Sequence, residues 1–266
     1  MKIVAIDSDR SFWSSGSIFK REVGFLRLMG MYLKVVFYIS NADHPNVVRF
    51  IGSYQDKTSM YIVTEKCMGG EIFERICTMK RFSEHEVSVL LVQILRAIEY
   101  VHSLGVIHRD IKAENFLFTG RGDVIKLIDF GLAVKITQPS ERFTAIVGSA
   151  HYLAPEMVYQ NYSKPVDVWS AGIMMYLMLF GKYPFDGPND DVVIKAIKKG
   201  KIEFPNEISH NAKSLLQSLL NKDQNLRPTA SIALAHPFIA DNDEAHTEVG
   251  TSSGTNGDWM LNEEDY

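Results

Sequence analysis

The clearest hydrophobic pattern of the chain begins at the stretch RFSEHEV, residues 81–87. Ser83 and Glu86 have the spacing of a capping box, in which each side chain accepts a backbone hydrogen bond from the other residue at a helix N-terminus. Apolar residues then recur at helical spacing, at Val87, Leu90, Leu91, Ile94, Ile98 and Val101. Phe82 can pack against Val87 as a hydrophobic staple, and Gly105 ends the pattern. The sequence therefore predicts a helix between these two signals.

The first part of the chain shows strand-like patterns instead. Three segments are rich in β-branched and aromatic residues: Lys2–Ile6, Val47–Tyr54 and Ser59–Glu65. The turn QDKT separates the last two, and one helical pattern, near Ser11–Met29, interrupts the series. From residue 84 onward helical patterns dominate. This order predicts an α+β fold with two lobes, a small β-rich lobe followed by a larger helical lobe, and a cleft between them.

Composition narrows the class of protein. The chain has 266 residues, 46% of them hydrophobic, which is enough for one large domain or two lobes with a proper core. Its net charge of −4 gives no general attraction to nucleic acid or to anionic membranes. The longest apolar run, residues 171–181, is too short to span a bilayer and suits a buried helix.

Cys67 and Cys77 have the pattern of neither a disulfide framework nor a zinc site. Since no signal peptide is visible either, we expect a cytoplasmic or nuclear protein.

Polar residues with catalytic potential gather in HRDIKAENFLFTGRGDVIKLIDFG, residues 108–131. Two short strands, FLF and VIKLI, flank the turn GRGD and predict a hairpin, which brings its two ends together. Asp110 and Asn115 would then lie beside Asp129, with Lys112 close by. Carboxylate and amide oxygens in this arrangement can hold a hard divalent cation and orient a hydroxyl near it. The alternative is a solvated loop with a few acids. That interpretation does not explain why three spaced motifs agree in their order and in their residues.

These motifs resemble those of a known family. HRDIKAEN, DFG and GSAHYLAPE are similar to the catalytic loop, the metal-binding loop and the end of the activation segment of eukaryotic protein kinases. DVWSAGI, residues 167–173, and the arginine of NLRP follow in the family's order. The resemblance runs from Lys2 to Ile239. It implies a kinase catalytic domain over residues 1–239 with an incomplete β-rich lobe, followed by an acidic tail, residues 240–266, that we expect to be disordered.

The resemblance implies catalytic roles residue by residue. Asp110 would accept the proton of the substrate hydroxyl, and Lys112 would steady the transferred phosphoryl group. Asn115 and Asp129 would hold Mg²⁺ on the phosphates of ATP. The implied cofactors are therefore ATP and Mg²⁺.

The resemblance also implies structural contacts and a substrate class. Glu156 would form an ion pair with Arg227, and Asp167 would brace the catalytic loop. The substrate class is implied by two residues. Lys112 lies two residues after the catalytic aspartate, and Ser149 would contact Lys112. Both resemble the pattern of Ser/Thr kinases rather than that of tyrosine kinases.

Within the family, HPNVVRFIGSYQD and GGEIFERI look most like the calcium- and calmodulin-dependent kinase group, with calcium-dependent protein kinases as the nearest comparison. The resemblance implies an ATP-binding hinge that starts at Glu65 and includes Cys67, after Thr64 as gatekeeper. Glu71 and Glu114 match acids that receive basic substrate residues in that group, and ordinary exposed acids are an equally good interpretation of both. The implied partners are protein substrates with basic residues before the Ser or Thr.

The chain departs from this group in its calcium control. No stretch has the spacing of an EF-hand loop, since DNDEAHTEVG lacks the glycine and the terminal glutamate at the needed places. No basic amphipathic helix of the calmodulin-target type follows Ile239. We therefore expect no direct calcium or calmodulin site in this chain.

The N-terminal part departs from the family as well. The first two strands and the Gly-rich loop have no counterpart, and Lys2–Ile6 resembles the third strand. Glu22 matches the helix glutamate that pairs with the ATP-contacting lysine of that strand. We expect Lys2 rather than Asp7 at the lysine position, and an ordinary terminal lysine is the alternative. The surplus stretch GMYLKVVFYIS, residues 30–40, is either a functional insertion or a translated intron, and we favour the latter.

The expected function is therefore that of an ATP-dependent Ser/Thr protein kinase whose nucleotide binding and rate are impaired by the missing N-terminal elements. The alternative, from a different class, is a non-catalytic kinase-like scaffold that binds partners. A small-molecule phosphotransferase of related fold is disfavoured by Ala154-Pro155-Glu156 and by Ser149, which resemble elements of protein-substrate recognition.

Overall fold

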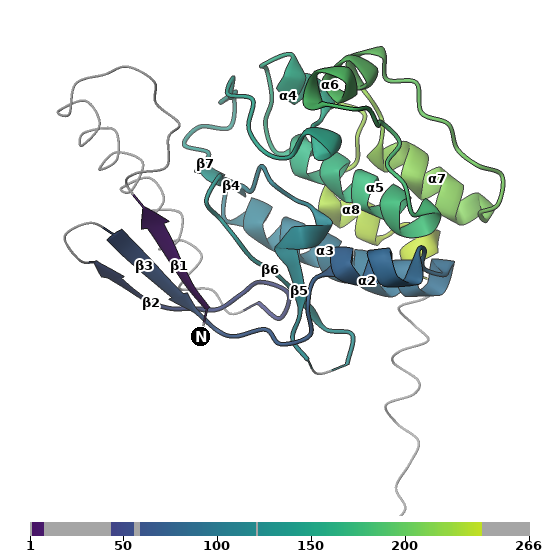
Figure 1. Cartoon of the computed structure of the whole chain (residues 1–266). Coiled ribbons are helices and arrows are strands. Elements are labelled where there is room, and N and C mark those ends of the chain that lie inside the picture. Colours follow the sequence, from purple (N-terminus) through teal and green to yellow (C-terminus); the bar gives the residue numbers. More distant parts are fainter. Residues whose placement is uncertain (1, 8–43, 56–58, 121, 241–266) are drawn as a thin grey trace, which may run out of the picture.

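The computed structural model describes residues 2–7, 44–55, 59–120 and 122–240. The side chain of Lys2, the helix expected near Ser11–Met29 with Glu22 in it, the stretch 30–40 and the tail from residue 241 lie outside the described residues. The pairing of Lys2 with Glu22 therefore stays a prediction. The described part has the expected α+β fold, with a small β-rich lobe beside a larger helical lobe (Figure 1).

One three-stranded antiparallel sheet forms the β-rich lobe. Its strands are β1 (Lys2–Asp7), β2 (Phe50–Gln55) and β3 (Ser59–Thr64), in the order β1-β3-β2. The register places the backbone of Lys2 opposite Thr64, at the end of β3 that leads into the expected hinge. The strand expected at Lys2–Ile6 is therefore confirmed, and it forms one edge of the sheet in the described part of the chain.

The strand expected from Val47 begins only at Phe50, so that boundary was wrong. Val47 instead forms a parallel bridge with Leu127, and the Val48 N–H donates to the Leu127 carbonyl at 2.9 Å. Both valines are buried. Their apolar side chains, which suggested a strand of the sheet, fasten the β-rich lobe to the hairpin of the helical lobe.

The helix expected after RFSEHEV is α3 (Glu84–Ser103). The Ser83 hydroxyl accepts the Glu86 N–H at 3.3 Å, and the Glu86 carboxylate accepts the Ser83 N–H at 2.8 Å, which confirms the capping box. Phe82 and Val87 are both buried. Gly105, with φ of +69°, lies just beyond the end of the helix, as a left-handed stop signal should.

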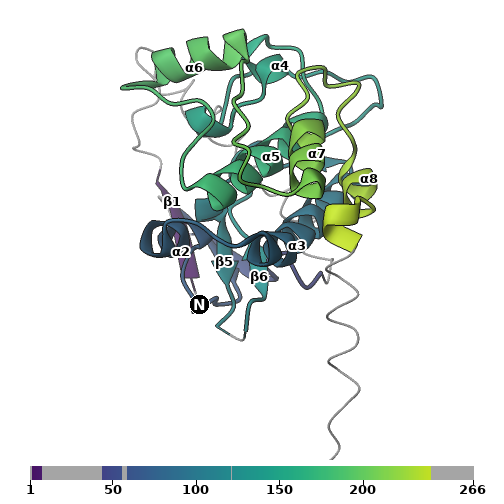
Figure 2. The ribbon, with the colours of Figure 1, turned by 90° about the vertical axis from the view of Figure 1, so that its right-hand side faces the viewer.

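α5 (Pro165–Phe180) runs through the middle of the helical lobe (Figure 2). All of its residues from Val166 to Leu179 are buried, so the expected buried helix is confirmed. α5 packs against α3 and α7 (His210–Leu219), and α8 (Ala230–Leu234) packs on α3. The other helices of the described residues are α2 (Ile72–Met79), α4 (Pro155–Val158) and α6 (Asp190–Lys199). Within the described residues, no helix combines the length and the apolar character needed to cross a membrane.

Two small antiparallel strand pairs position the loops that carry the polar motifs. β5 (Phe116–Phe118) and β6 (Ile125–Leu127) form the expected hairpin, with Phe116 opposite Leu127. β4 (Val106–Ile107) pairs with β7 (Val134–Lys135). Two 3₁₀ turns, η1 (Ala113–Asn115) and η2 (Ala150–Tyr152), complete these connections. The loop that precedes β5 and the loop that follows β6 therefore meet at the same end of the hairpin.

Candidate active site

A buried carboxylate holds the loop that carries Asp110. Asp167 lies in the first turn of α5 and is 1% exposed. It accepts the backbone N–H groups of His108 and Arg109, each at 2.9 Å, and contacts His102 Nε2 at 2.9 Å. Burial alone would raise the pKa of Asp167, but the hydrogen bond and charge of His102, with the contacts of His108, hold it below its usual value. The expected brace is confirmed, and it supports the left-handed φ of +66° at Arg109, just before Asp110.

A second support is His108, which sequence reasoning did not single out although it opens the HRD motif. Its ring is buried, with Nε2 3.2 Å from the Ile128 carbonyl, and its Nδ1 accepts the Asp110 N–H at 3.3 Å. Burial lowers the pKa of His108, which keeps the ring neutral. A neutral ring can donate through Nε2 and accept through Nδ1 at once. The ring thereby links Asp110 to the segment that leads into Asp129.

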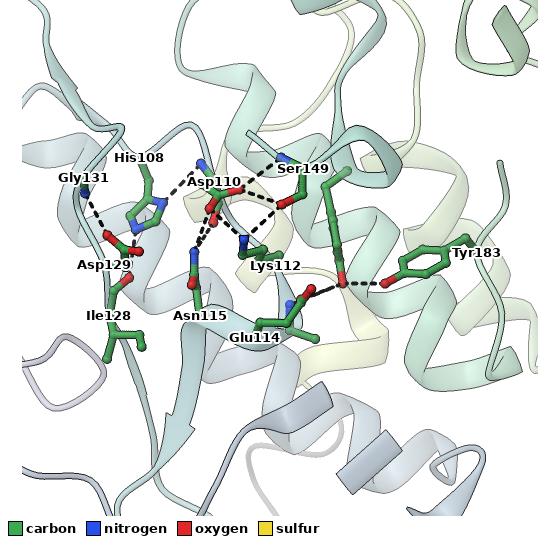
Figure 3. Close-up of polar contacts among 12 residues, drawn as sticks. His108, Asp110, Lys112, Glu114, Asn115, Ile128, Asp129, Gly131, Ser149 and Tyr183 are labelled. Atoms are coloured by element: carbon green, nitrogen blue, oxygen red, sulfur yellow. Dashed lines mark hydrogen bonds and ion pairs between the residues drawn. The ribbon is translucent and has the colours of Figure 1, made fainter. Parts of the chain in front are cut away.

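The Asp110 carboxylate lies at the centre of a polar network (Figure 3). Its Oδ1 accepts from the backbone N–H and the hydroxyl of Ser149, both at 3.2 Å. Its Oδ2 accepts from the Asn115 amide at 3.1 Å and lies 3.0 Å from the Lys112 ammonium. The Lys112 ammonium also donates to the Ser149 hydroxyl at 3.0 Å, which confirms that expected contact. Four side chains from two motifs, HRDIKAEN and GSAHYLAPE, are thus brought into one cluster.

Asp129 reaches the same loop from the other end of the hairpin. The Ile128 N–H donates to the Asn115 carbonyl at 2.9 Å, and Asp129 has a left-handed φ of +59°. Asp129 Oδ1 accepts the Gly131 N–H at 3.0 Å, while the Asn115 amide nitrogen is used on Asp110. Asp129 Oδ2 and Asn115 Oδ1 accept no hydrogen bond from any of the described residues.

A carboxylate oxygen together with an amide oxygen suits a hard cation such as Mg²⁺. These two oxygens would supply only part of an oxygen shell, so the pair fits an open site completed by other ligands. In the described part of the chain, no group of three or more His, Cys, Asp or Glu side chains could hold a metal by itself. The residues therefore fit a cation shared with phosphate oxygens better than a closed structural metal site.

The side chain of Glu65 is already engaged at the expected hinge. Its carboxylate contacts the Lys126 ammonium and the Arg49 N–H, both at 2.7 Å. Burial raises the pKa of Glu65, but these hydrogen bonds outweigh burial and bring the pKa below its usual value. The side chain thus ties the end of β3 to β6, and the Glu65 N–H donates to the Arg49 carbonyl at 3.0 Å. The contact of this residue with ATP stays a prediction. Cys67, two residues on, is half-buried.

The two acids expected to receive basic substrate residues lie on neighbouring elements. Glu71 directly precedes α2, and Glu114 lies in η1, which packs against α2. Glu114 accepts the Tyr152 hydroxyl at 3.3 Å, a contact that the sequence did not indicate. Both acids are half-buried, and their contact with substrate stays a prediction.

A cavity of about 420 Å³ lies away from this cluster, beside α3 and the turn between β5 and β6. Arg75, His85 and Val124 are among its lining residues, and none of the clustered residues lines it. The side chains able to accept a proton, bind a cation and stabilise a phosphoryl group are those of Asp110, Lys112, Asn115, Asp129 and Ser149, which we call the loop cluster. The loop cluster, rather than the cavity, is therefore the candidate active site.

Gly148, just before Ser149, should not tolerate a side chain. Its φ is +96°, and an added Cβ would lie 2.5 Å from the Arg109 carbonyl oxygen and 3.4 Å from Asp110 Oδ1. Gly148→Ala should push Ser149 away from Asp110. We expect it to lower kcat by roughly tenfold or more and the free energy of unfolding by roughly 1–3 kcal/mol.

Gly122→Ala is the matched control for this substitution. Gly122 has φ of +59°, and nothing lies within 4 Å of an added Cβ, so the variant carries the backbone strain without the clash. Steady-state kinetics and thermal unfolding of both variants make the comparison. Equal losses of kcat in the two would contradict the role given to the close contact at Gly148.

The fold and the site together define a class. A small antiparallel sheet, a larger helical lobe and a polar cluster on the loops that follow β4, β6 and β7 are the arrangement of a protein kinase catalytic domain. A family model for the protein kinase domain matches residues 33–239, and the chain belongs to this family.

Calcium-dependent protein kinases are among the relatives. Calcium-dependent protein kinase 29 of Arabidopsis thaliana is 42% identical over 203 residues, which cover 74% of this chain and 38% of the relative. Calcium-dependent protein kinase 11 of Oryza sativa subsp. japonica is 42% identical over 204 residues, 74% of this chain and 35% of the relative. CDPK-related kinase 5 of Arabidopsis thaliana is 37% identical over 233 residues, which cover 85% of this chain and 37% of the relative. The group indicated by the motifs is confirmed, and the chain spans less than half the length of these relatives.

Proposed function

We propose that the chain is an ATP-dependent Ser/Thr protein kinase, which transfers the γ-phosphoryl group of ATP to a hydroxyl of a protein substrate. The observation that carries the proposal is the network in which Asp110 contacts Lys112, Asn115 and Ser149. Membership of the protein kinase family and the named kinase relatives support it.

The polar cluster supplies the groups that phosphoryl transfer needs. Asp110, fixed by three neighbouring residues, would accept the proton of the substrate hydroxyl. Lys112 lies 3.0 Å from both Asp110 and the Ser149 hydroxyl, where it can stabilise charge on the transferred group. Asp129 Oδ2 and Asn115 Oδ1 would hold Mg²⁺. Bound MgATP would supply the phosphoryl group and much of its charge neutralisation.

The same contacts support the proposed substrate class. The contact of Lys112 with Ser149 favours Ser or Thr as the acceptor. Glu71 and Glu114 would receive Arg or Lys before the acceptor through charge-assisted hydrogen bonds.

The proposed location is the cytoplasm or the nucleus. Both cysteines are thiols rather than partners in a disulfide, which suits a reducing compartment.

The proposal is tested with the purified chain, MgATP and peptides that contain Ser, Thr or Tyr as the one acceptor. EGTA is present because the sequence has no EF-hand spacing. We expect phosphorylation of Ser and Thr peptides, faster when Arg or Lys precedes the acceptor, and none of Tyr peptides. Nucleotide and peptide binding without any phosphoryl transfer would favour the scaffold alternative instead.

A further inference from the structure

A chain of polar groups runs from the connection between α5 and α6 to the catalytic loop. The Tyr183 hydroxyl lies 3.3 Å from the Tyr152 hydroxyl, which donates to Glu114 Oε2 at 3.3 Å. Figure 3 labels the two ends of this chain, Tyr183 and Glu114. The Tyr152 oxygen also accepts the Ala113 N–H at 3.4 Å. Both Ala113 and Glu114 belong to η1, the turn that also carries Asn115. Tyr183 therefore connects a distant loop to the predicted substrate acid.

The direction of these hydrogen bonds follows from their chemistry. A carboxylate only accepts, so Tyr152 gives its single proton to Glu114, and the Tyr183 hydroxyl donates to the Tyr152 oxygen. Burial raises the pKa of both tyrosines, so both keep their protons at neutral pH. The chain is polarised from Tyr183 through Tyr152 to Glu114, and each hydrogen bond strengthens the next.

The ring of Tyr183 is held on two sides. The His151 ring lies against it at a tilt of 30°, with centroids 4.4 Å apart, and Tyr152 meets it edge-on at 5.6 Å. Two residues earlier, Gly181 ends α5 in the left-handed conformation, with its N–H bonded to the Leu177 carbonyl at 2.8 Å. The Tyr183 hydroxyl thus has a fixed direction.

Resting on the proposed function, we propose that Tyr183 is a positioning residue that sets the preference for a basic residue in the substrate. Through Tyr152, its hydroxyl holds the Glu114 carboxylate in one orientation. Oε2 is then used by Tyr152, whereas Oε1 makes no hydrogen bond with the part of the chain that the structure describes. Oε1 can therefore meet the guanidinium group of an arginine. Without the Tyr183 hydroxyl, the proton of Tyr152 can turn away from Glu114, and the peptide must immobilise Glu114 itself, which weakens binding.

The test uses peptides with a single Arg at each position before the acceptor, each beside its Ala counterpart. The position at which Glu114→Gln removes the preference for Arg defines the peptide pair. Tyr183→Phe keeps the ring and removes the hydroxyl. We expect it to raise KM and the directly measured Kd of the Arg peptide about three- to tenfold. The kcat values and the constants of the Ala peptide should not change.

Tyr176→Phe is the matched control. It removes a buried tyrosine hydroxyl that donates to the Glu203 carbonyl at 3.0 Å, in the same lobe but outside the Glu114 contacts. It should leave the ratio of Arg to Ala peptide unchanged. Adding Tyr183→Phe to Glu114→Gln should have no further effect on that ratio.

Several outcomes would overturn the inference: equal weakening of both peptides by Tyr183→Phe, additive effects in the double variant, or a parent chain that binds Arg and Ala peptides equally at every position. If Tyr183→Phe lowers the melting temperature, Tyr152→Phe breaks the same chain at its middle and must reproduce the loss of the Arg preference. An Arg preference in Kd that Tyr183→Phe removes, without any phosphoryl transfer by the parent chain, would refute the proposed kinase activity and support the inference about Tyr183.

Discussion

Replacing Asp110 by Asn should lower the rate of phosphoryl transfer by about 10²–10⁴-fold while the fold stays intact. An amide has no basic oxygen to take the proton of the substrate hydroxyl. The change also disturbs the network, because Oδ2 now accepts from Asn115 at 3.1 Å and lies 3.0 Å from the Lys112 ammonium. An NH₂ group at that position would face two donors. The Asp110 carboxylate makes polar contacts with Lys112, Asn115 and Ser149, so its loss should be felt in catalysis rather than in folding.

Single-turnover rates at saturating ATP and peptide measure this effect directly, and thermal unfolding gives the folded fraction. Asp123→Asn is the matched control: the chemical change is the same, but Asp123 pairs with Arg75 at 2.8 Å and its side chain is 65% exposed. It should turn over at the parent rate. If Asp110→Asn kept turnover within about tenfold of the parent at equal folded fraction, Asp110 would lose its role as the base.

Local sequence signals predicted the elements that depend on local contacts. The capping box of α3 and the hairpin of β5 and β6 involve residues close in sequence, so the pattern contains the interaction itself. The family motifs then brought Asp110, Asn115 and Ser149 together. The fold class and the centre of the candidate site were therefore predictable from the sequence.

Tertiary contacts decided what the sequence did not predict. Val47 and Val48 look like strand residues, but their partner Leu127 lies in the other lobe, so burial rather than strand pairing explains their apolar character. The Glu65 carboxylate is engaged by Lys126, which is far away in sequence. The chain from Tyr183 to Glu114 likewise joins three separate segments, and no spacing rule within one segment could indicate it.

Replacing Glu156 by Ala should destabilise the fold strongly. Glu156 and Arg227 form the expected ion pair, bidentate, with Nη2 3.0 Å from Oε2 and both residues buried. Arg227 also donates to the carbonyls of Asn221 and Pro165, each at 2.8 Å, and lies over the Trp169 ring at 5.0 Å. Because the guanidinium stays charged, Glu156→Ala leaves a buried cation without its counter-ion. We expect the free energy of unfolding to fall by about 3–5 kcal/mol, measured by urea unfolding.

A double variant distinguishes the contribution of the ion pair from a simple loss of packing. Glu156→Leu combined with Arg227→Met replaces both charges by apolar groups of similar size, and should lose less stability than the sum of the two single changes. Glu207→Ala is the surface control, since its pair with Arg81 is exposed on both sides and spans 3.4 Å; it should change stability little. Additive losses in the double variant, or a loss below about 1 kcal/mol for Glu156→Ala, would contradict a buried, coupled pair. Glu156 lies in α4, directly after the segment that carries Ser149, so the same pair should also limit how far Ser149 can move from Asp110.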